Sequence, residues 1–277
     1  MVIMIQGTAS NVGKTVLTLA LCRIFRQDGY KVAPFKPQNI TSNTHLCENG
    51  DEIAVSQYLQ ALSAEVTPTA DMNPIVLKPQ SVNNAQVIVN GKHFAETGLY
   101  NFRELKHQLI PKVKDAYSRL RALHDIIVIE GAGSPVELNL NQNDIVNMGM
   151  AKMANAPVIM VSDIDRGGVF ASLYGTVKLL DYSEKPYVKA TIVNRFKGEP
   201  QYFAEGVEIL EAILGLPVAG VVPYMDINLP EEDSIHDTIN AQSNFETQFN
   251  SIAATVRNSL NMDLIYKILR TGMEILP

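Results

Sequence analysis

The sequence feature that most limits the fold is the stretch MIQGTASNVGKTVLTLA, where a short apolar run enters a loop and the loop enters a helical pattern. The ending Gly13-Lys14-Thr15 is typical of a phosphate-binding loop. The usual pattern has its first glycine where this chain has Thr8, and Gly7 stands one residue earlier. Backbone N–H groups of such a loop surround phosphate oxygens, and the helix N-terminus adds partial positive charge. The residues expected around the phosphates are Gly7, Thr8, Asn11, Val12, Gly13, Lys14 and Thr15.

Beyond the loop, short runs rich in Val and Ile alternate with helical patterns. Runs that are apolar throughout predict parallel strands covered on both faces. The alternation predicts a doubly wound, mostly parallel α/β sheet, in which ligands bind beyond the carboxyl ends of the strands. We expect strands at residues 2–6, 32–36, 125–130, 157–163, 188–194 and 218–223, and helices at 13–28, 101–123, 145–154, 169–180 and 202–214.

Two segments depart from the alternation. Residues 37–100 are expected to hold a short helix at 53–64 and a hairpin that turns at Asn90-Gly91, an excursion of the size that builds a lid or a substrate wall. We predict a main domain at 1–230, a linker at 231–244 and an amphipathic helical tail at 245–277, broken near Asn261. An apolar stripe usually marks core, so packing on the main domain is favoured over a docking surface for a partner.

Polar residues at the expected strand ends are the candidates for chemistry. Lys14 can reach the β- and γ-phosphates, and Thr15 can offer its hydroxyl to Mg²⁺. Glu130, which ends the third strand before Gly131-Ala132-Gly133, is a second candidate Mg²⁺ ligand. Lys36, at the end of the second strand, is expected to neutralise a phosphoryl group in transfer.

Two later strands also end in polar residues. Arg166 can grip a substrate carboxylate through two hydrogen bonds. Asp163 and Asp165 can orient Arg166 or can cap the following helix, and the sequence favours neither role. Asn194 can hydrogen-bond a nucleotide base or satisfy loop backbone instead.

Composition excludes several classes of protein. The net charge of −6 is the opposite of the overall positive charge that is typical of nucleic-acid-binding proteins, so no nucleic-acid partner is expected. The two cysteines, Cys22 and Cys47, form neither a disulfide framework nor a zinc site. No apolar run has the length of a membrane span and no signal peptide is recognisable, so we expect a cytoplasmic protein without membrane contact.

Taken in order, the motifs GTASNVGKT, FKPQN, DMNPIVLKP, VIEGAGSP, DIVNMGMA, SDIDRGGVFASL, IVNRFKG and LPEEDS resemble the synthase half of the cobyric acid synthase family. The loop with Gly-Thr ahead of GKT is similar to that of dethiobiotin synthetase, a structural relative, so the resemblance implies a P-loop fold of that type. It also implies ATP, Mg²⁺ and a corrinoid substrate, adenosylcobyrinic acid a,c-diamide, whose peripheral carboxylates become amides through acyl phosphates. By the same likeness, Asn194 and the segment near Pro223 hold adenine, and Glu52 is a second metal ligand.

The family normally continues into a glutaminase domain, and nothing in this sequence resembles one. The source of ammonia is therefore left open between free ammonia, a separate glutaminase subunit and a shortened chain, and a homodimer is one option for the assembly. Three other functions are weighed against amidation: a dethiobiotin synthetase-like carboxylase, a MinD/ParA-type partition ATPase and a non-catalytic binder. The FKPQN and DIDRGGVF segments argue against the carboxylase, and the absence of a lysine in residues 6–9 argues against the partition ATPase.

Overall fold

The central element of the computed structural model is a six-stranded sheet in the order β12-β11-β10-β1-β9-β2, in which every pairing is parallel. The structure describes residues 1–81, 84–98, 102–139, 144–227, 229–230 and 245–274. All six predicted strands are confirmed. Their bounds are β1 (Val2–Gly7), β2 (Val32–Phe35), β9 (Ile126–Glu130), β10 (Val158–Asp163), β11 (Val188–Phe196) and β12 (Val218–Pro223).

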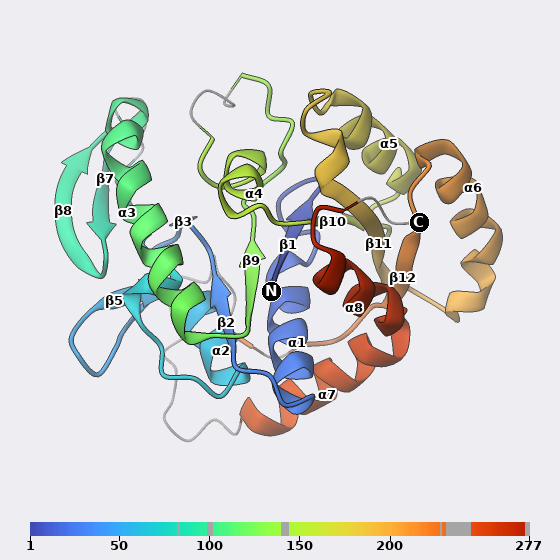
Figure 1. Ribbon diagram of the computed structural model, residues 1–277, viewed down its shortest axis with the longest axis horizontal. Coiled ribbons are helices and arrows are strands. Elements are labelled where there is room, and N and C mark those ends of the chain that lie inside the picture. The colour runs from blue at the N-terminus through green and yellow to red at the C-terminus, as the bar shows by residue number, and fades with distance from the viewer. Residues whose placement is uncertain (82–83, 99–101, 140–143, 228, 231–244, 275–277) are drawn as a thin grey trace.

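Helices cover both faces of this sheet, as Figure 1 shows. The inward residues of β1 alternate: Ile3 and Ile5 pack toward one helical layer, whereas Met4 packs toward the other. The first layer consists of α1 (Lys14–Gln27), α2 (Val55–Ser63), α7 (Phe245–Ser259) and α8 (Met262–Thr271); the second consists of α3 (Phe102–Leu123), α4 (Met148–Ala154), α5 (Val169–Leu179) and α6 (Ala204–Leu214). Short 3₁₀ turns lie at η1 (Ala70–Met72), η2 (Lys185–Tyr187) and η3 (Pro200–Phe203). The doubly wound α/β fold is confirmed.

The excursion between β2 and α3 builds a second sheet at one end of the molecule (Figure 1). Asn90 and Gly91 form the two-residue turn of the predicted hairpin, with φ values of 49° and 76°. Positive φ at both positions matches the right-handed twist of the flanking strands. The sheet has the order β3-β6-β7-β8, with β3 (Gln38–Ile40), β6 (Ile75–Ser81), β7 (Asn84–Val89) and β8 (Lys92–Thr97), beside the pair β4 (Thr44–Leu46) and β5 (Glu52–Ala54).

The C-terminal helices pack on the sheet and on α1. The predicted break is confirmed at Asn261, whose side-chain oxygen accepts a hydrogen bond from the Leu264 N–H at 3.0 Å and so caps α8. Arg23 of α1 pairs with Glu246 of α7, and the Asn261 N–H donates to the Ala219 carbonyl of β12. The proposed linker at 231–244 lies outside the described residues, and the domain boundaries stay a prediction.

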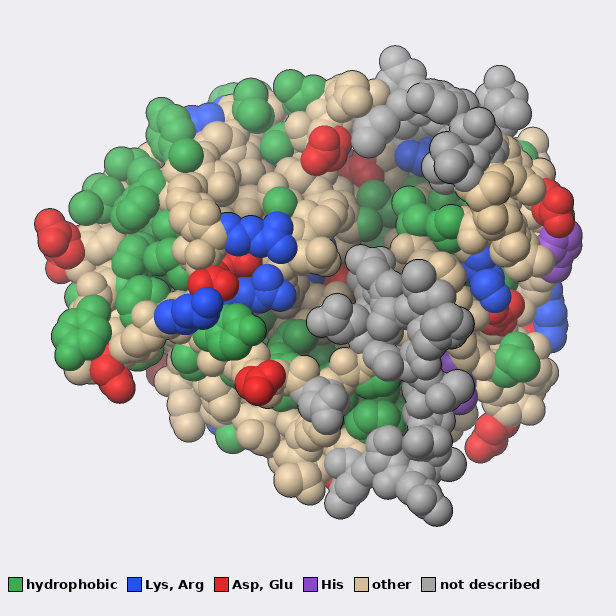
Figure 2. Space-filling view, turned by 180° about the vertical axis from the view of Figure 1, so that it is seen from behind, with side chains coloured by type: hydrophobic (Ala, Val, Ile, Leu, Met, Phe, Trp, Pro, Cys, Tyr) green, Lys and Arg blue, Asp and Glu red, His purple; other side chains and the backbone are tan. Residues whose placement is uncertain are grey.

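Surface charge on the face seen in Figure 2 is mixed, with basic side chains lying next to acidic ones rather than forming one basic surface. Within the described part of the chain, no helix combines the length and the apolar character needed to cross a bilayer.

Candidate functional site

The loop between β1 and α1 has the backbone of a phosphate-binding loop. Gly13 has a φ of 98°, and a Cβ built on it would lie 2.0 Å from Asn194 Nδ2, so only glycine fits there. The Lys14 ammonium folds back over the loop and donates to the carbonyls of Ala9, at 2.8 Å, and Gly133, at 3.1 Å. Thr8 Oγ1 donates to Ser162 Oγ at 3.0 Å, which joins the loop to the end of β10. The loop is therefore held from both neighbouring strands.

A buried carboxylate lies directly beside the start of α1. One oxygen of Glu130, Oε1, accepts from Thr15 Oγ1 at 2.8 Å and from Lys36 Nζ at 3.1 Å. The other, Oε2, accepts from Gln60 Nε2 at 2.6 Å and lies 3.5 Å from Gln57 Nε2. Glu130 is 1% exposed and Lys36 is 4% exposed, so both are shielded from water. A buried ion is tolerated only when its partners are in place, and here four donors surround the carboxylate.

Thr15, Glu130 and Lys36 therefore lie together as the sequence predicts, whereas Glu52 does not join them. Glu52 pairs with Lys78 Nζ and accepts from the Thr44 hydroxyl. No hydrogen bond or ion pair among the described residues connects it to Thr15 or Glu130, and no group of three or more His, Cys, Asp or Glu side chains in that part of the chain is placed to hold a metal. Glu52 begins β5 inside the excursion rather than ending a parallel strand of the main sheet, so no rule of sheet geometry brings it to the site.

The loop after β10 is held together by its own carboxylates. Asp163 Oδ1 accepts from the Asp165 N–H at 2.7 Å, and its Oδ2 lies 3.1 Å from Arg195 Nη1. Asp165 pairs with Lys197 at 2.7 Å, and this hydrogen bond raises the pKa of the lysine. Neither aspartate caps α5, because Gly168 occupies the cap position in a left-handed conformation without a side-chain hydrogen bond.

Arg166 differs from its acidic neighbours because it is 70% exposed and lies 3.9 Å from Asp163. It lines a small groove of about 90 Å³ beside the phosphate-binding loop. The residues around this groove are Thr8, Ala9, Ser10, Val12, Ser162, Asp163, Arg166, Gly167 and Ser172. The guanidinium is therefore available to an anionic group next to the loop.

Asn194, at the end of β11, binds the phosphate-binding loop through only one atom of its side-chain amide, the nitrogen. Its Nδ2 donates to the Val12 carbonyl at 2.8 Å, while its buried Oδ1 has no hydrogen-bond partner among the described residues. A buried acceptor without a partner costs free energy, so this oxygen has unused capacity for a donor such as the amino group of a base.

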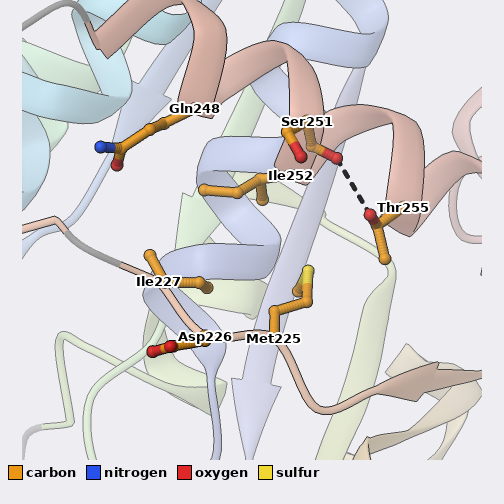
Figure 3. Close-up of a pocket in the computed structure, with 7 residues that line it drawn as sticks. All are labelled: Met225, Asp226, Ile227, Gln248, Ser251, Ile252 and Thr255. Carbon is orange, nitrogen blue, oxygen red and sulfur yellow. Dashed lines mark hydrogen bonds between the residues drawn. The ribbon is translucent and has the colours of Figure 1, made fainter.

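The segment after Pro223 runs toward α7 and forms one wall of a second groove. The Tyr224 N–H donates to the Phe196 carbonyl, which fixes this segment to the end of β11. In Figure 3, Met225, Ile227 and Ile252 face the space between the segment and α7, and Thr255 donates to the Ser251 carbonyl at 3.0 Å. The groove has a volume of about 240 Å³.

Sequence reasoning missed Gln57 and Gln60, although both are completely buried and touch Glu130. Polar residues in an amphipathic helix usually mark its solvent face. The available signal was their spacing, because residues three apart lie on the same face of a helix, and α2 is the helix inside the excursion.

The fold, the loop and the convergent Thr15–Glu130–Lys36 group define a nucleotide-binding α/β protein of the P-loop class. The model of the CobQ/CobB/MinD/ParA nucleotide binding domain family matches residues 3–237, and the chain belongs to this family.

Relatives bear out the more specific resemblance. Cobyric acid synthase from Ruminiclostridium cellulolyticum is 51% identical over 235 residues, which is 85% of this chain and 46% of the relative. The cobyric acid synthase of Alkaliphilus metalliredigens is 48% identical over 88% of this chain and 48% of the relative. That of Streptococcus sanguinis is 47% identical over 84% of this chain and 47% of the relative. The chain thus spans about half the length of the curated relatives it matches. MinD from Aquifex aeolicus aligns with 100% of this chain and 98% of its own at 15% identity, but its TM-score of 0.44 supports no functional comparison.

Proposed function

We propose that this chain uses ATP to amidate peripheral carboxylates of (adenosyl)cobyrinic acid a,c-diamide, toward cobyric acid, with ammonia supplied from outside the chain. The observation that carries the proposal is the buried Thr15–Glu130–Lys36 group beside the phosphate-binding loop, in a chain about half identical to named cobyric acid synthases. A site of this kind suits phosphoryl transfer, which depends mainly on positioning and on neutralising charge.

The proposed reaction has two steps. A substrate carboxylate oxygen attacks the γ-phosphorus, the bond to the β-phosphate oxygen breaks, and ADP leaves behind an acyl phosphate. Ammonia then attacks the acyl carbon, the carbon–oxygen bond to phosphate breaks, the nitrogen loses a proton, and an amide and inorganic phosphate result. Lys14 and Lys36 are the cations proposed to offset the phosphoryl charge during the first step.

Thr15 and Glu130 fit a magnesium site, because both offer oxygen ligands at the start of α1 and their side chains are already hydrogen-bonded to each other. Bound Mg²⁺ supplies neutralisation of phosphate charge. Glu52 is left out of the proposed ligand set because Lys78 and Thr44 engage its carboxylate.

Substrate and nucleotide are proposed to bind at neighbouring strand ends, beyond β10 and β11. Arg166 contacts a carboxylate of the corrinoid at the small groove, while Asp163 and Asp165 hold the loop that presents it. The partnerless Oδ1 of Asn194, on the strand next to β10, accepts from the adenine amino group, and the segment after Pro223 supports the base.

Neither cysteine suits the nucleophilic role that glutamine hydrolysis requires. Cys22 is fully buried in the core, and burial raises its pKa; burial also raises the pKa of Cys47. The reactive form is the thiolate, which a raised pKa suppresses. We therefore assign the nitrogen source to something outside these 277 residues: free ammonia, a separate glutaminase subunit or a further part of a longer chain.

The test incubates the purified chain with cobyrinic acid a,c-diamide, MgATP and ammonium, and follows product mass. Each amidation exchanges a hydroxyl for an amino group, so the number of amides can be counted. We expect amide products with ammonium and none with glutamine alone. A folded protein that binds MgATP but forms no amide would contradict the proposal, and activity with glutamine alone would contradict the assignment of the nitrogen source.

A further inference from the structure

The carboxylate of Glu130 accepts hydrogen bonds at both of its oxygens. Its Oε1 is shared by Thr15 and Lys36, whereas its Oε2 receives the amide of Gln60 at 2.6 Å. The Gln60–Glu130 contact is shorter than either contact to Oε1, and both side chains are buried. Hydrogen bonds to charged groups are shorter and stronger than those between neutral groups, so this amide is a principal restraint on the carboxylate.

Gln60 also touches the other proposed metal ligand. The same amide nitrogen lies 3.3 Å from the Thr15 carbonyl in the first turn of α1. An amide group has two N–H donors, so one can serve the carboxylate and the other the helix backbone. Gln60 therefore fixes the relative position of Thr15 and Glu130 from a third element, α2.

A second glutamine fixes the orientation of the first. Gln57 Oε1 accepts from Asn39 Nδ2 and from Ser56 Oγ, each at 3.0 Å. Because its oxygen is engaged there, its amide nitrogen points toward Gln60 Oε1, at 3.4 Å, and Glu130 Oε2, at 3.5 Å. A chain of amides thus runs from β3 in the second sheet to the carboxylate, and each member polarises the next.

The side-chain amides of Asn39, Gln57 and Gln60 are neutral donors, which matters for a metal ligand. Lys36 already pairs with Oε1, so a second cation at Oε2 would compensate the carboxylate further, whereas an amide at Oε2 orients it without adding positive charge. Hydrogen-bond partners of metal ligands generally set ligand orientation in this way.

We infer that Gln60, supported by Gln57, is a positioning residue that sets the plane of the Glu130 carboxylate for Mg²⁺. The inference rests on the proposed function only in taking Glu130 as the metal ligand. It also gives the excursion at residues 37–100 a role at the nucleotide site, because the amide chain begins at Asn39.

The test replaces the glutamine by an apolar residue of similar length, Gln60→Met, and measures binding rather than turnover. ATP affinity is titrated with and without Mg²⁺, and Mn²⁺ bound in the presence of ATP is followed by electron paramagnetic resonance. We expect metal affinity to fall by about 10-fold or more, within the range typical for partners of metal ligands, with metal-free ATP affinity unchanged. The Mn²⁺ spectrum is expected to change as well, which a loss of stability alone would not cause.

Two further variants separate positioning from stability. Gln57→Met is expected to weaken metal binding less than Gln60→Met, because its contact with Glu130 is 3.5 Å rather than 2.6 Å. Ser63→Ala is the matched control on the same helix: Ser63 is buried and donates to the Leu19 carbonyl at 3.1 Å, so its loss lowers the unfolding midpoint without changing metal affinity. Unfolding of each variant is measured in a chelator, without metal.

Unchanged metal affinity in Gln60→Met, or an equal loss in Ser63→Ala, would overturn the inference. If Gln60→Met does not fold, Gln57→Met decides by the same measure: weakened metal binding supports the inference and wild-type binding overturns it. These experiments measure binding constants and a spectrum, so they do not depend on amide formation. A wild-type protein that binds MgATP but forms no amide would contradict the proposed function without contradicting the role of Gln60.

Discussion

On either side of β1 a neighbouring strand ends in a buried carboxylate, and the two carboxylates have different surroundings. Glu130, at the end of β9, receives a hydroxyl, an ammonium and two side-chain amides. Asp163, at the end of β10, accepts a backbone N–H of its own loop and pairs with Arg195. Position at the carboxyl edge of the sheet therefore does not by itself decide what a carboxylate does.

Each carboxylate has one cationic partner at 3.1 Å, so the difference lies in the other groups that surround it. Asp163 is neutralised by a guanidinium whose residue has a φ of 61°, a conformation that persists only when its surroundings enforce it. Glu130 also has one cationic partner, Lys36 Nζ at 3.1 Å, but its other donors, from Thr15, Gln60 and Gln57, are neutral. We interpret Glu130 as part of the chemistry and Asp163 as the residue that shapes the loop carrying Arg166.

The largest effect is expected at Glu130. Glu130→Gln keeps the shape of the side chain but removes the charge, so amide formation should fall by about 100-fold or more, as when other charge-stabilising groups are removed from active sites. The rate is measured at saturating ATP and ammonium. Wild-type turnover in the variant would remove Glu130 from the mechanism.

The matching change at Asp163 should act on stability instead. Asp163→Asn retains an oxygen for the Asp165 N–H but breaks the pair with Arg195, and the free energy of unfolding is expected to fall by about 1–3 kcal/mol. Denaturant unfolding measures the loss. The amidation rate should fall far less than in Glu130→Gln; an equal fall would show that both carboxylates serve the chemistry.

A smaller effect is expected at the other end of the same pair. Arg195→Gly loses the contact with Asp163 but removes the cost of a left-handed backbone, roughly 1–2 kcal/mol for a residue other than glycine. The lost contact destabilises the protein and the relieved backbone stabilises it, so the unfolding midpoint should change less than in Asp163→Asn. A larger drop than in Asp163→Asn would mean that Arg195 has a role beyond this pair.

The smallest effect concerns alkaline pH. The hydrogen bond that Lys197 donates to Asp165 raises the pKa of the lysine above its ordinary 10.5. The folded protein therefore holds this proton more tightly than the unfolded chain, so its stabilisation is complete below pH 10.5 and is lost as pH rises through the raised pKa. The unfolding midpoint of the wild type should fall with rising pH in this range, and Lys197→Met should lose that part of the fall. Lys178→Met, at another exposed lysine, should retain it. An unchanged slope in Lys197→Met would contradict the assignment.

The sequence predicted the part of the site that follows from parallel strands. Lys36 and Glu130 end predicted strands and Thr15 starts the helix after another, and the carboxyl ends of parallel strands lie at one edge of a sheet. That β9 lies between β1 and β2, which brings the three together, is a result of the structure. Gln57 and Gln60 were missed because a buried glutamine and a solvent-facing one look alike in a helical pattern. Glu52 was assigned by family likeness, and its partners Lys78 and Thr44 are set by the packing of the second sheet, which local pattern does not encode.

The central claim is that the γ-phosphate passes to a substrate carboxylate, and isotope transfer tests it most directly. Cobyrinic acid a,c-diamide labelled with ¹⁸O in its peripheral carboxylates is incubated with the chain, MgATP and ammonium, and the inorganic phosphate released is analysed by mass. The acyl-phosphate route predicts that each amide formed delivers one labelled oxygen to phosphate, because the attacking carboxylate oxygen leaves with it. Amide formation with unlabelled phosphate would contradict the account.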